Sequence, residues 1–187
     1  MKTIQFNQKL YDNINYWITS DLHFGHHNIM KFCPATRPWT SATAMDEALI
    51  AEWNSKVQPN DVVFHLGDFS FYGIDKTKEI LSRLNGTIVF VLGNHDKSLD
   101  STNLPNKFRL LEVRFKGHKL VMCHYPMVSW NQNGRGSIMF HGHCHGSLPK
   151  QPGRILDVGY DSLGSIMRLD VVVNKMLKQP IQTQDKH

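Results

Sequence analysis

The chain has 187 residues, 41% of them hydrophobic and 20% charged, which is the composition of one soluble globular domain and excludes disordered, collagenous and coiled-coil proteins. It has no apolar stretch of the ~18 residues that span a membrane, no hydrophobic signal segment in residues 1–8, and three cysteines without zinc-ribbon spacing. We therefore expect a single cytoplasmic domain over residues 1–187, with reduced cysteines, no membrane contact and, from its net charge of +5, a mild preference for anionic partners.

Short apolar runs rich in β-branched and aromatic residues predict strands over 16–20, 61–66, 87–92, 110–115, 119–123, 137–140 and 155–158. An apolar stripe from Met45 to Val57 predicts a helix with Thr43 as its N-cap, and residues 74–84 predict a second helix capped by Asp75. Residues 169–177 suit either a helix or a strand. This order predicts an α/β fold with a mixed sheet or two packed sheets flanked by helices.

Polar side chains follow the predicted strands at the point where each strand ends. They are Asp21, His23, Asp68, Asn94, His95, His124, His143 and His145. Proteins of the α/β class build their sites at the C-terminal ends of strands, so we expect these side chains to lie close together. Residues two apart in an extended chain point the same way, which places Asp21 beside His23 and His143 beside His145.

Carboxylate, amide and imidazole groups without a thiolate suit Mn, Fe, Ni, Co or Zn at a hydrolytic centre. The set is larger than the roughly four protein ligands of one zinc ion, so the pattern indicates two divalent ions. A single Asp-x-His or a single histidine after a strand is a weak signal of metal binding. Motifs of this kind that follow one strand after another are hard to explain as ordinary polar residues of the surface.

The blocks resemble, in this order along the chain, the motifs of the calcineurin-like metallophosphoesterases: Asp21-Leu22-His23, Gly67-Asp68, Gly93-Asn94-His95-Asp96, His124, and Gly142-His143-Cys144-His145. Residues 20–26 also resemble the short stand-alone phosphohydrolases of bacteria and their phages. The resemblance implies an αββα sandwich with a dinuclear metal site at the strand ends. It implies that one ion is held by Asp21, His23, Asp68 and His145, and the other by Asp68, Asn94, His124 and His143, with Asp68 bridging.

The expected activity is metal-dependent hydrolysis of a small phosphate mono- or diester, with a nucleotide as the expected substrate and manganese as the first metal to test. Attack by a hydroxide that bridges the two ions would open the phosphoester. The resemblance gives His95 the role of general acid at the leaving group, and Asp96 is a candidate to hold its other ring nitrogen. A nuclease acting on single-stranded nucleic acid and a catalytically silent nucleotide-binding module remain as alternatives, and the oligomeric state stays open.

One departure from the family disfavours a protein phosphatase: Phe71 and Tyr72 stand where Ser/Thr phosphatases of this superfamily have an aspartate and an arginine. The loops 24–44 and 126–136 are the expected walls of an open, shallow cleft. Further side chains have two interpretations each, one at the site and one structural. Arg37, Arg135 and Arg154 would clamp phosphate or carry surface charge, and Trp39 and Trp130 would stack a base or pack locally. His26 would line the site or be an ordinary polar loop residue, His65 would be a hydrogen-bonded core histidine or support a ligand, and His141 would support a ligand.

Overall fold

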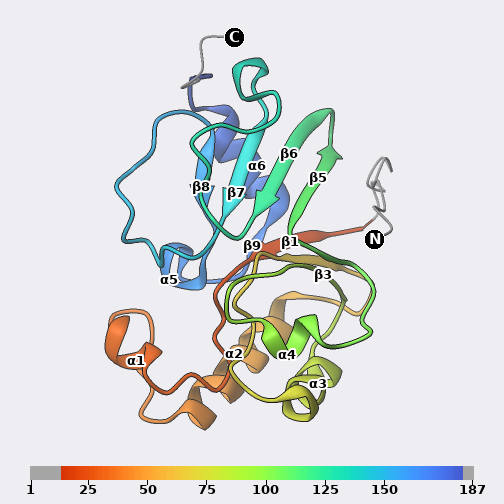
Figure 1. Ribbon diagram of the computed structural model, residues 1–187, viewed down its shortest axis with the longest axis vertical. Coiled ribbons are helices and arrows are strands. Elements are labelled where there is room, and N and C mark those ends of the chain that lie inside the picture. The colour runs from red at the N-terminus through yellow and green to blue at the C-terminus, as the bar shows by residue number, and fades with distance from the viewer. Residues whose placement is uncertain (1–13, 183–187) are drawn as a thin grey trace.

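A computed structural model describes residues 14–182, so the expectation drawn from residues 1–8 lies outside the described residues. Its centre is two mixed sheets (Figure 1). The first has the order β4-β3-β2-β1-β9 and is parallel except for β9; its strands are β1 (Tyr16–Thr19), β2 (Val62–His65), β3 (Thr87–Val91), β4 (Lys107–Phe108) and β9 (Met167–Arg168).

The second sheet has the order β5-β6-β7-β8 and is parallel except for β5. Its strands are β5 (Leu110–Phe115), β6 (His118–Cys123), β7 (Ile138–His141) and β8 (Ile155–Asp157). Strands β5 and β6 form a hairpin, whose turn residues Lys116 and Gly117 both have positive φ, as a tight two-residue hairpin requires. The prediction of an α/β fold with two mixed sheets flanked by helices is confirmed.

The helices are α1 (Ile29–Phe32), α2 (Ala42–Lys56), α3 (Ile74–Arg83), α4 (Lys97–Asp100), α5 (Tyr160–Leu163) and α6 (Leu169–Leu177), with a 3₁₀ turn η1 at Asn133–Arg135. Helices α2, α3 and α4 lie on one side of the first sheet, and α6 lies beside the second (Figure 1). Across residues 14–182 no helix is long and apolar enough to cross a bilayer.

Both predicted helix caps were wrong. The Ser41 hydroxyl, rather than Thr43, accepts the backbone N–H of Ala44 at 3.1 Å and caps α2, because the chain is still extended at Ser41. Helix α3 begins after Gly73, which places Asp75 inside its first turn. There the carboxylate complements the positive end of the helix without capping it.

Two apolar cores hold the layers together. Ile18, Leu120 and Phe140 are among the buried residues between the two sheets, and α6 contributes to the same core. Trp53 and Phe90 belong to the second core, between the first sheet and helices α2 and α3. Strands β1, β2 and β3 run parallel in register, so the chain leaves all three at one edge of the sheet and positions the residues that follow them.

Candidate metal centre

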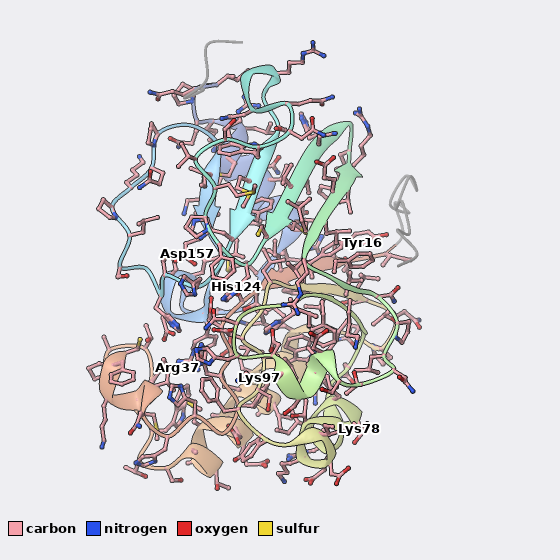
Figure 2. All side chains as sticks on the ribbon, viewed as in Figure 1. Tyr16, Arg37, Lys78, Lys97, His124 and Asp157 are labelled. Atoms are coloured by element: carbon pink, nitrogen blue, oxygen red, sulfur yellow. The ribbon has the colours of Figure 1, made fainter. Side chains whose placement is uncertain are left out.

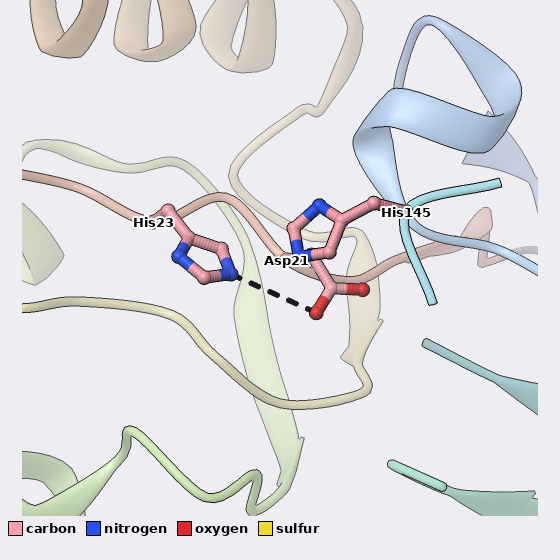
Figure 3. A group of neighbouring side chains, drawn as sticks. All are labelled: Asp21, His23 and His145. Atoms are coloured by element: carbon pink, nitrogen blue, oxygen red, sulfur yellow. Dashed lines mark ion pairs between the residues drawn. The ribbon is translucent and has the colours of Figure 1, made fainter. Parts of the chain in front are cut away.

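The structure brings the predicted metal ligands together in two groups at the C-terminal ends of the strands. Asp21, His23 and His145 form the first group, and the ligand atoms within it lie within 4.8 Å of one another (Figure 3). Asp68, His124 and His143 form the second group by the same measure. Each group therefore combines residues from both sheets, since β1 and β2 lead to Asp21, His23 and Asp68, whereas β6 and β7 lead to the other histidines.

Asp21 and His23 of the first group are buried, His145 is half-buried, and the group has an unsatisfied nitrogen at its centre. His23 Nε2 is buried without a hydrogen-bond partner, 3.9 Å from Asp21 Oδ1 and 3.6 Å from Asp68 Oδ2. A buried ring nitrogen without a partner costs free energy unless a ligand or water satisfies it. With Asp21, Asp68 and His145, His23 completes a donor set of two carboxylates and two imidazoles, which fits a divalent cation.

Asp68 lies between the two groups. Its Oδ2 atom is 3.6 Å from His23 Nε2 and 3.5 Å from His124 Nε2, so one carboxylate oxygen faces a histidine of each group. Its other oxygen, Oδ1, accepts the backbone N–H of His95 at 2.9 Å. This placement is the one that the resemblance requires of a bridging ligand.

In the second group, His124 is oriented by the backbone. Its Nδ1 atom lies 2.8 Å from the carbonyl oxygen of Leu66, a contact that requires Nδ1 to carry the proton. In the neutral ring, Nε2 then presents its lone pair toward Asn94 Oδ1 at 3.0 Å. Two lone pairs at this distance suit a cation between them. His143, the third member of the group, is exposed.

The electrostatics of the site keep its carboxylates negative. Burial alone would raise the pKa of Asp68, but the hydrogen bond and the charge of His124 outweigh it and lower this pKa to about 2. The neighbouring histidines likewise hold the pKa of the buried Asp21 below its usual value against the effect of burial. Burial lowers the pKa of His23, and partial burial with the charge of His124 lowers the pKa of His143, which favours neutral rings. Against the effect of burial, the hydrogen bonds to Asp68 and Asp161 raise the pKa of His124 and of His145.

Several candidate ligands do not lie in extended chain. The alternation of side chains along a strand, which was used to pair Asp21 with His23 and His143 with His145, is therefore not the physical reason for their positions. The backbone is left-handed, with φ between 48° and 70°, at Asp21, His23, Asp68, His143 and His145. For residues with a side chain this conformation costs about 1–3 kcal/mol each, and it persists where the surrounding structure enforces it, as at functional sites. The loops turn sharply after each strand and so direct these side chains into one place.

Glycines in the motifs leave room for the carboxylates. A Cβ atom at Gly93 would collide with Asp68 Oδ1, and one at Gly142 would collide with Ser20 and with Asp21 Oδ2. The backbone therefore approaches both carboxylates more closely than any other residue would allow. Gly93 and Gly142 each belong to a block that the sequence pattern singled out.

His95 lies at the open side of Asp68. Its ring is 45% exposed, its Nε2 atom is 4.0 Å from Asp68 Oδ2, and it stacks on the Phe71 ring at 4.6 Å between centroids. Asp96 was expected to hold the His95 ring, but it does not. The Asp96 side chain is buried and instead accepts the backbone N–H groups of Asp68, Phe69 and Gly93, which fixes the two loops against each other.

The interpretation of the three arginines as phosphate clamps is not supported by their contacts. Arg37 is 1% exposed and pairs with Asp161, so it is neither a phosphate clamp nor surface charge. Arg154 donates to backbone carbonyls, including that of Gly136 at 3.0 Å, and Arg135 is exposed in η1.

The remaining aromatic side chains and histidines follow the structural interpretation with one exception. Trp130 packs in a small core with Val121 and Met139, and Trp39 packs against the core under the first sheet. His65 was expected to be hydrogen-bonded, but it is fully buried and neither of its ring nitrogens has a partner. Its ring packs on Phe69 instead, because its strand places it on the helix side of the sheet.

His141 and His26 lie close to the candidate ligands. His141 is buried, with Nδ1 2.8 Å from the carbonyl oxygen of Gly142, so it supports the backbone of the last motif. His26 Nδ1 lies 3.1 Å from His23 Nδ1, and its ring stacks on Phe71 at 4.0 Å between centroids. His26 is therefore half-buried beside the first group.

Asp161 is the residue at the site that the sequence did not suggest. Its carboxylate lies 2.7 Å from His145 Nδ1 and pairs with Arg37. It follows strand β8 at the same edge of the second sheet as His124 and His143. This position was the signal that could have identified it.

Comparison with known proteins agrees with the motifs. A family model described as calcineurin-like phosphoesterase matches residues 14–183. An uncharacterized protein of Methanocaldococcus jannaschii is 40% identical over 131 residues, which cover 69% of this chain and 68% of that protein. The gene 66 protein of Mycobacterium phage D29 is 28% identical over 193 residues, covering 84% and 94% of the two chains. The crystal structure of an Aquifex aeolicus protein of unknown function has the same fold, with a TM-score of 0.68 at 21% identity, over 87% of this chain and 99% of that one.

Proposed function

This chain belongs to the calcineurin-like phosphoesterase family, and from that premise we propose that it hydrolyses small phosphate mono- or diesters, with nucleotides as the substrate class. Membership of the family makes the chain a metal-dependent phosphoesterase, and the proposal adds the size and kind of substrate. The observation that carries the proposed hydrolytic centre is the position of Asp68, one oxygen of which faces both His23 and His124.

We propose that the two ligand groups hold two divalent ions, with manganese as the first to test. The first ion would be held by Asp21, His23, Asp68 and His145, and the second by Asp68, Asn94, His124 and His143. When bound, the ions supply Lewis acidity to the phosphate oxygens and lower the pKa of a water molecule. The protein holds both carboxylates ionised and directs the histidine nitrogens toward them.

On the leaving-group side, His95 is the proposed general acid. It is exposed beside the shared carboxylate, and its ring rests on Phe71, which is 39% exposed. Tyr125, 46% exposed, stands beside His143 on the second group. The exposed ring of Tyr125 offers a stacking surface to a planar leaving group, which supports a nucleotide over an alkyl phosphate.

The test is hydrolysis of p-nitrophenyl phosphate, bis(p-nitrophenyl) phosphate and a panel of nucleotides by metal-free protein, with and without added Mn²⁺. We expect turnover that requires the metal, stops on exhaustive chelation, and is faster for nucleotides than for alkyl phosphates of equal charge. Activity that survives exhaustive chelation would contradict the metal-dependent mechanism.

Two arms of the same experiment address the alternatives. Fragmentation of a single-stranded oligonucleotide at Mn²⁺ concentrations that barely turn over small esters would replace the proposal with a nuclease. Stoichiometric nucleotide binding without turnover, with several metals supplied, would replace it with a silent binding module.

A further inference from the structure

Arg37 is a buried arginine with all its nitrogens engaged. It lies in the loop between α1 and α2, at the position labelled in Figure 2, and is 1% exposed. Its Nε and NH2 atoms donate to the two oxygens of Asp161, at 2.9 and 3.0 Å, as a fork. The ring of Tyr160 stacks under the guanidinium at 4.6 Å. An arginine held in this way is fixed in position and direction.

The same guanidinium holds the loop that carries the first ligands. NH2 donates to the carbonyl oxygen of Asp21 at 2.6 Å, and NH1 donates to that of Leu22 at 2.8 Å. The peptides on either side of Leu22 are thereby tied to Arg37. This contact counteracts the cost of the left-handed backbone at Asp21 and His23.

Asp161 connects this arginine to the last ligand. Oδ2 lies 2.7 Å from His145 Nδ1, and Oδ1 also accepts the hydroxyl of Thr36. Because both oxygens of Asp161 face the Arg37 guanidinium and act as acceptors, the 2.7 Å contact requires a proton on His145 Nδ1. The other ring nitrogen of His145 is turned toward Asp21 (Figure 3).

The cluster is a hydrogen-bond network rather than another ion site. Cys33, His145 and Asp161 also lie within 4.8 Å of one another. Both oxygens of Asp161 are already occupied by donors from Arg37, His145 and Thr36, and these would have to be released before the carboxylate could bind a cation.

We propose that Arg37 and Asp161 are positioning residues that set the metal affinity of the first ligand group, without touching metal or substrate. One buried ion pair fixes Asp21 and His23 through their backbone and His145 through its ring, although Arg37 and Asp161 are 124 residues apart in the sequence. The inference rests on the proposed metal centre. Substitution of residues that orient metal ligands costs 10–100-fold in metal affinity or activity.

The test is calorimetric titration of the metal-free full chain with Mn²⁺ for the wild type, Arg37→Lys and Asp161→Asn. Lysine keeps the charge but has no fork to serve Asp161 and two carbonyls at once, and asparagine keeps the size but removes the charge. The matched control is Arg83→Lys, because Arg83 makes the same two-bonded pair with Glu47, exposed on the surface.

We expect one of the two binding events to weaken about 10–100-fold in Arg37→Lys and in Asp161→Asn, while the other event changes less than about twofold. Arg83→Lys should change neither. Activity at limiting Mn²⁺ should fall and then recover in excess Mn²⁺, with the KM for substrate unchanged. Melting of the metal-free proteins reports any general loss of structure, which would not select one ion.

Equal weakening of both events, or no weakening, in folded Asp161→Asn overturns the inference. If Arg37→Lys does not fold, Asp161→Asn decides alone. A wild type that binds no divalent ion would show instead that the proposed metal centre is wrong, and the inference would fall with it.

Discussion

The two groups of candidate ligands share a carboxylate and the same chemistry, but the protein orients their histidines in different ways. His124 follows directly after β6, and the carbonyl of Leu66 holds its ring. His145 lies beyond the end of β7 and is held by a side chain, Asp161, which needs Arg37 to offset its buried charge. A ligand next to a strand can use backbone that the sheet already positions. His145, farther along its loop, is held by a buried ion pair instead.

Removal of the Asp68 carboxylate, which the two groups share, should prevent metal binding at both of them. Asp68→Asn leaves His23 and His124 facing each other without a negative charge, so we expect both ions to be lost. Each ion contributes several kcal/mol to the transition state, which predicts a loss of at least about 10⁴-fold in kcat/KM for every substrate. Kinetics and metal analysis check this, with Asp100→Asn in an exposed ion pair as control. Retention of both ions would exclude a bridging role.

His95 lies beside the shared carboxylate and is a ligand of neither group in our assignment. His95→Ala should therefore keep both ions and the fold but lose about 10²–10⁴-fold with poor leaving groups, because general acid catalysis supplies that factor. An activated aryl leaving group needs little protonation and should be affected much less. Kinetics with matched alkyl and nitrophenyl esters measure the split. Equal damage to both ester classes, or loss of metal, would assign His95 another role.

Gly142→Ala should weaken metal binding at the first ligand group and leave the second group intact. The new Cβ would collide with Ser20 and with the Asp21 carboxylate, which belongs to the first group only. We expect about tenfold weaker binding of one ion, with the second binding event retained. Calorimetry with Mn²⁺ measures both events. Gly73→Ala before α3, where φ is −64° and no atom lies within 4 Å of the added Cβ, is a control for the substitution itself. An unchanged first event would mean that Asp21 is free to move without loss of metal.

The smallest effect on activity should come from substitution of His65. This buried histidine lacks the hydrogen-bond partners that hold the rings of His124 and His145. Burial lowers its pKa from 6.5 to about 3. Between these values the unfolded chain binds a proton that the folded chain does not, so folding free energy is lost as the pH falls. His65→Leu removes this proton uptake. Between pH 7 and pH 5 the free energy of unfolding of the variant should therefore fall by about 2 kcal/mol less than that of the wild type.

Chemical denaturation of the metal-free proteins at both pH values measures this difference, and activity at pH 7 should stay within about twofold of the wild type. The control is His118→Leu on the β5–β6 hairpin, a histidine that remains in contact with water. Parallel pH profiles for wild type and His65→Leu would show that His65 is not held neutral in the folded state.

Much of the site was predictable because it follows strand ends. The motif blocks and the rule that parallel strands end at one edge were sufficient to bring Asp21, Asp68, Asn94, His124 and His143 together. Local backbone was not predictable in the same way. Alternation along an extended chain pairs residues in a strand, but these side chains stand in left-handed turns that only the packed loops enforce.

Long-range partners were also beyond the sequence. Nothing near Arg37 in the chain indicates that it pairs with Asp161, because the pairing depends on how two distant loops pack. Asp96 has polar partners in three backbone amides, which no spacing rule distinguishes from the His95 ring. The short elements α1, α4, α5, β4 and β9 have too few residues to show a period, so the hydrophobic pattern did not detect them.

The loop after β7 has a consequence for the order in which the protein is made. It supplies His143 to one group and His145 to the other, so neither group has all its members until this loop has been synthesised. A nascent chain that emerges N-terminus first carries Asp21, His23 and Asp68 long before these histidines. Metal capture in this assignment is thus a late event of biosynthesis, and a chain released before residue 143 would be an incomplete binder of either ion.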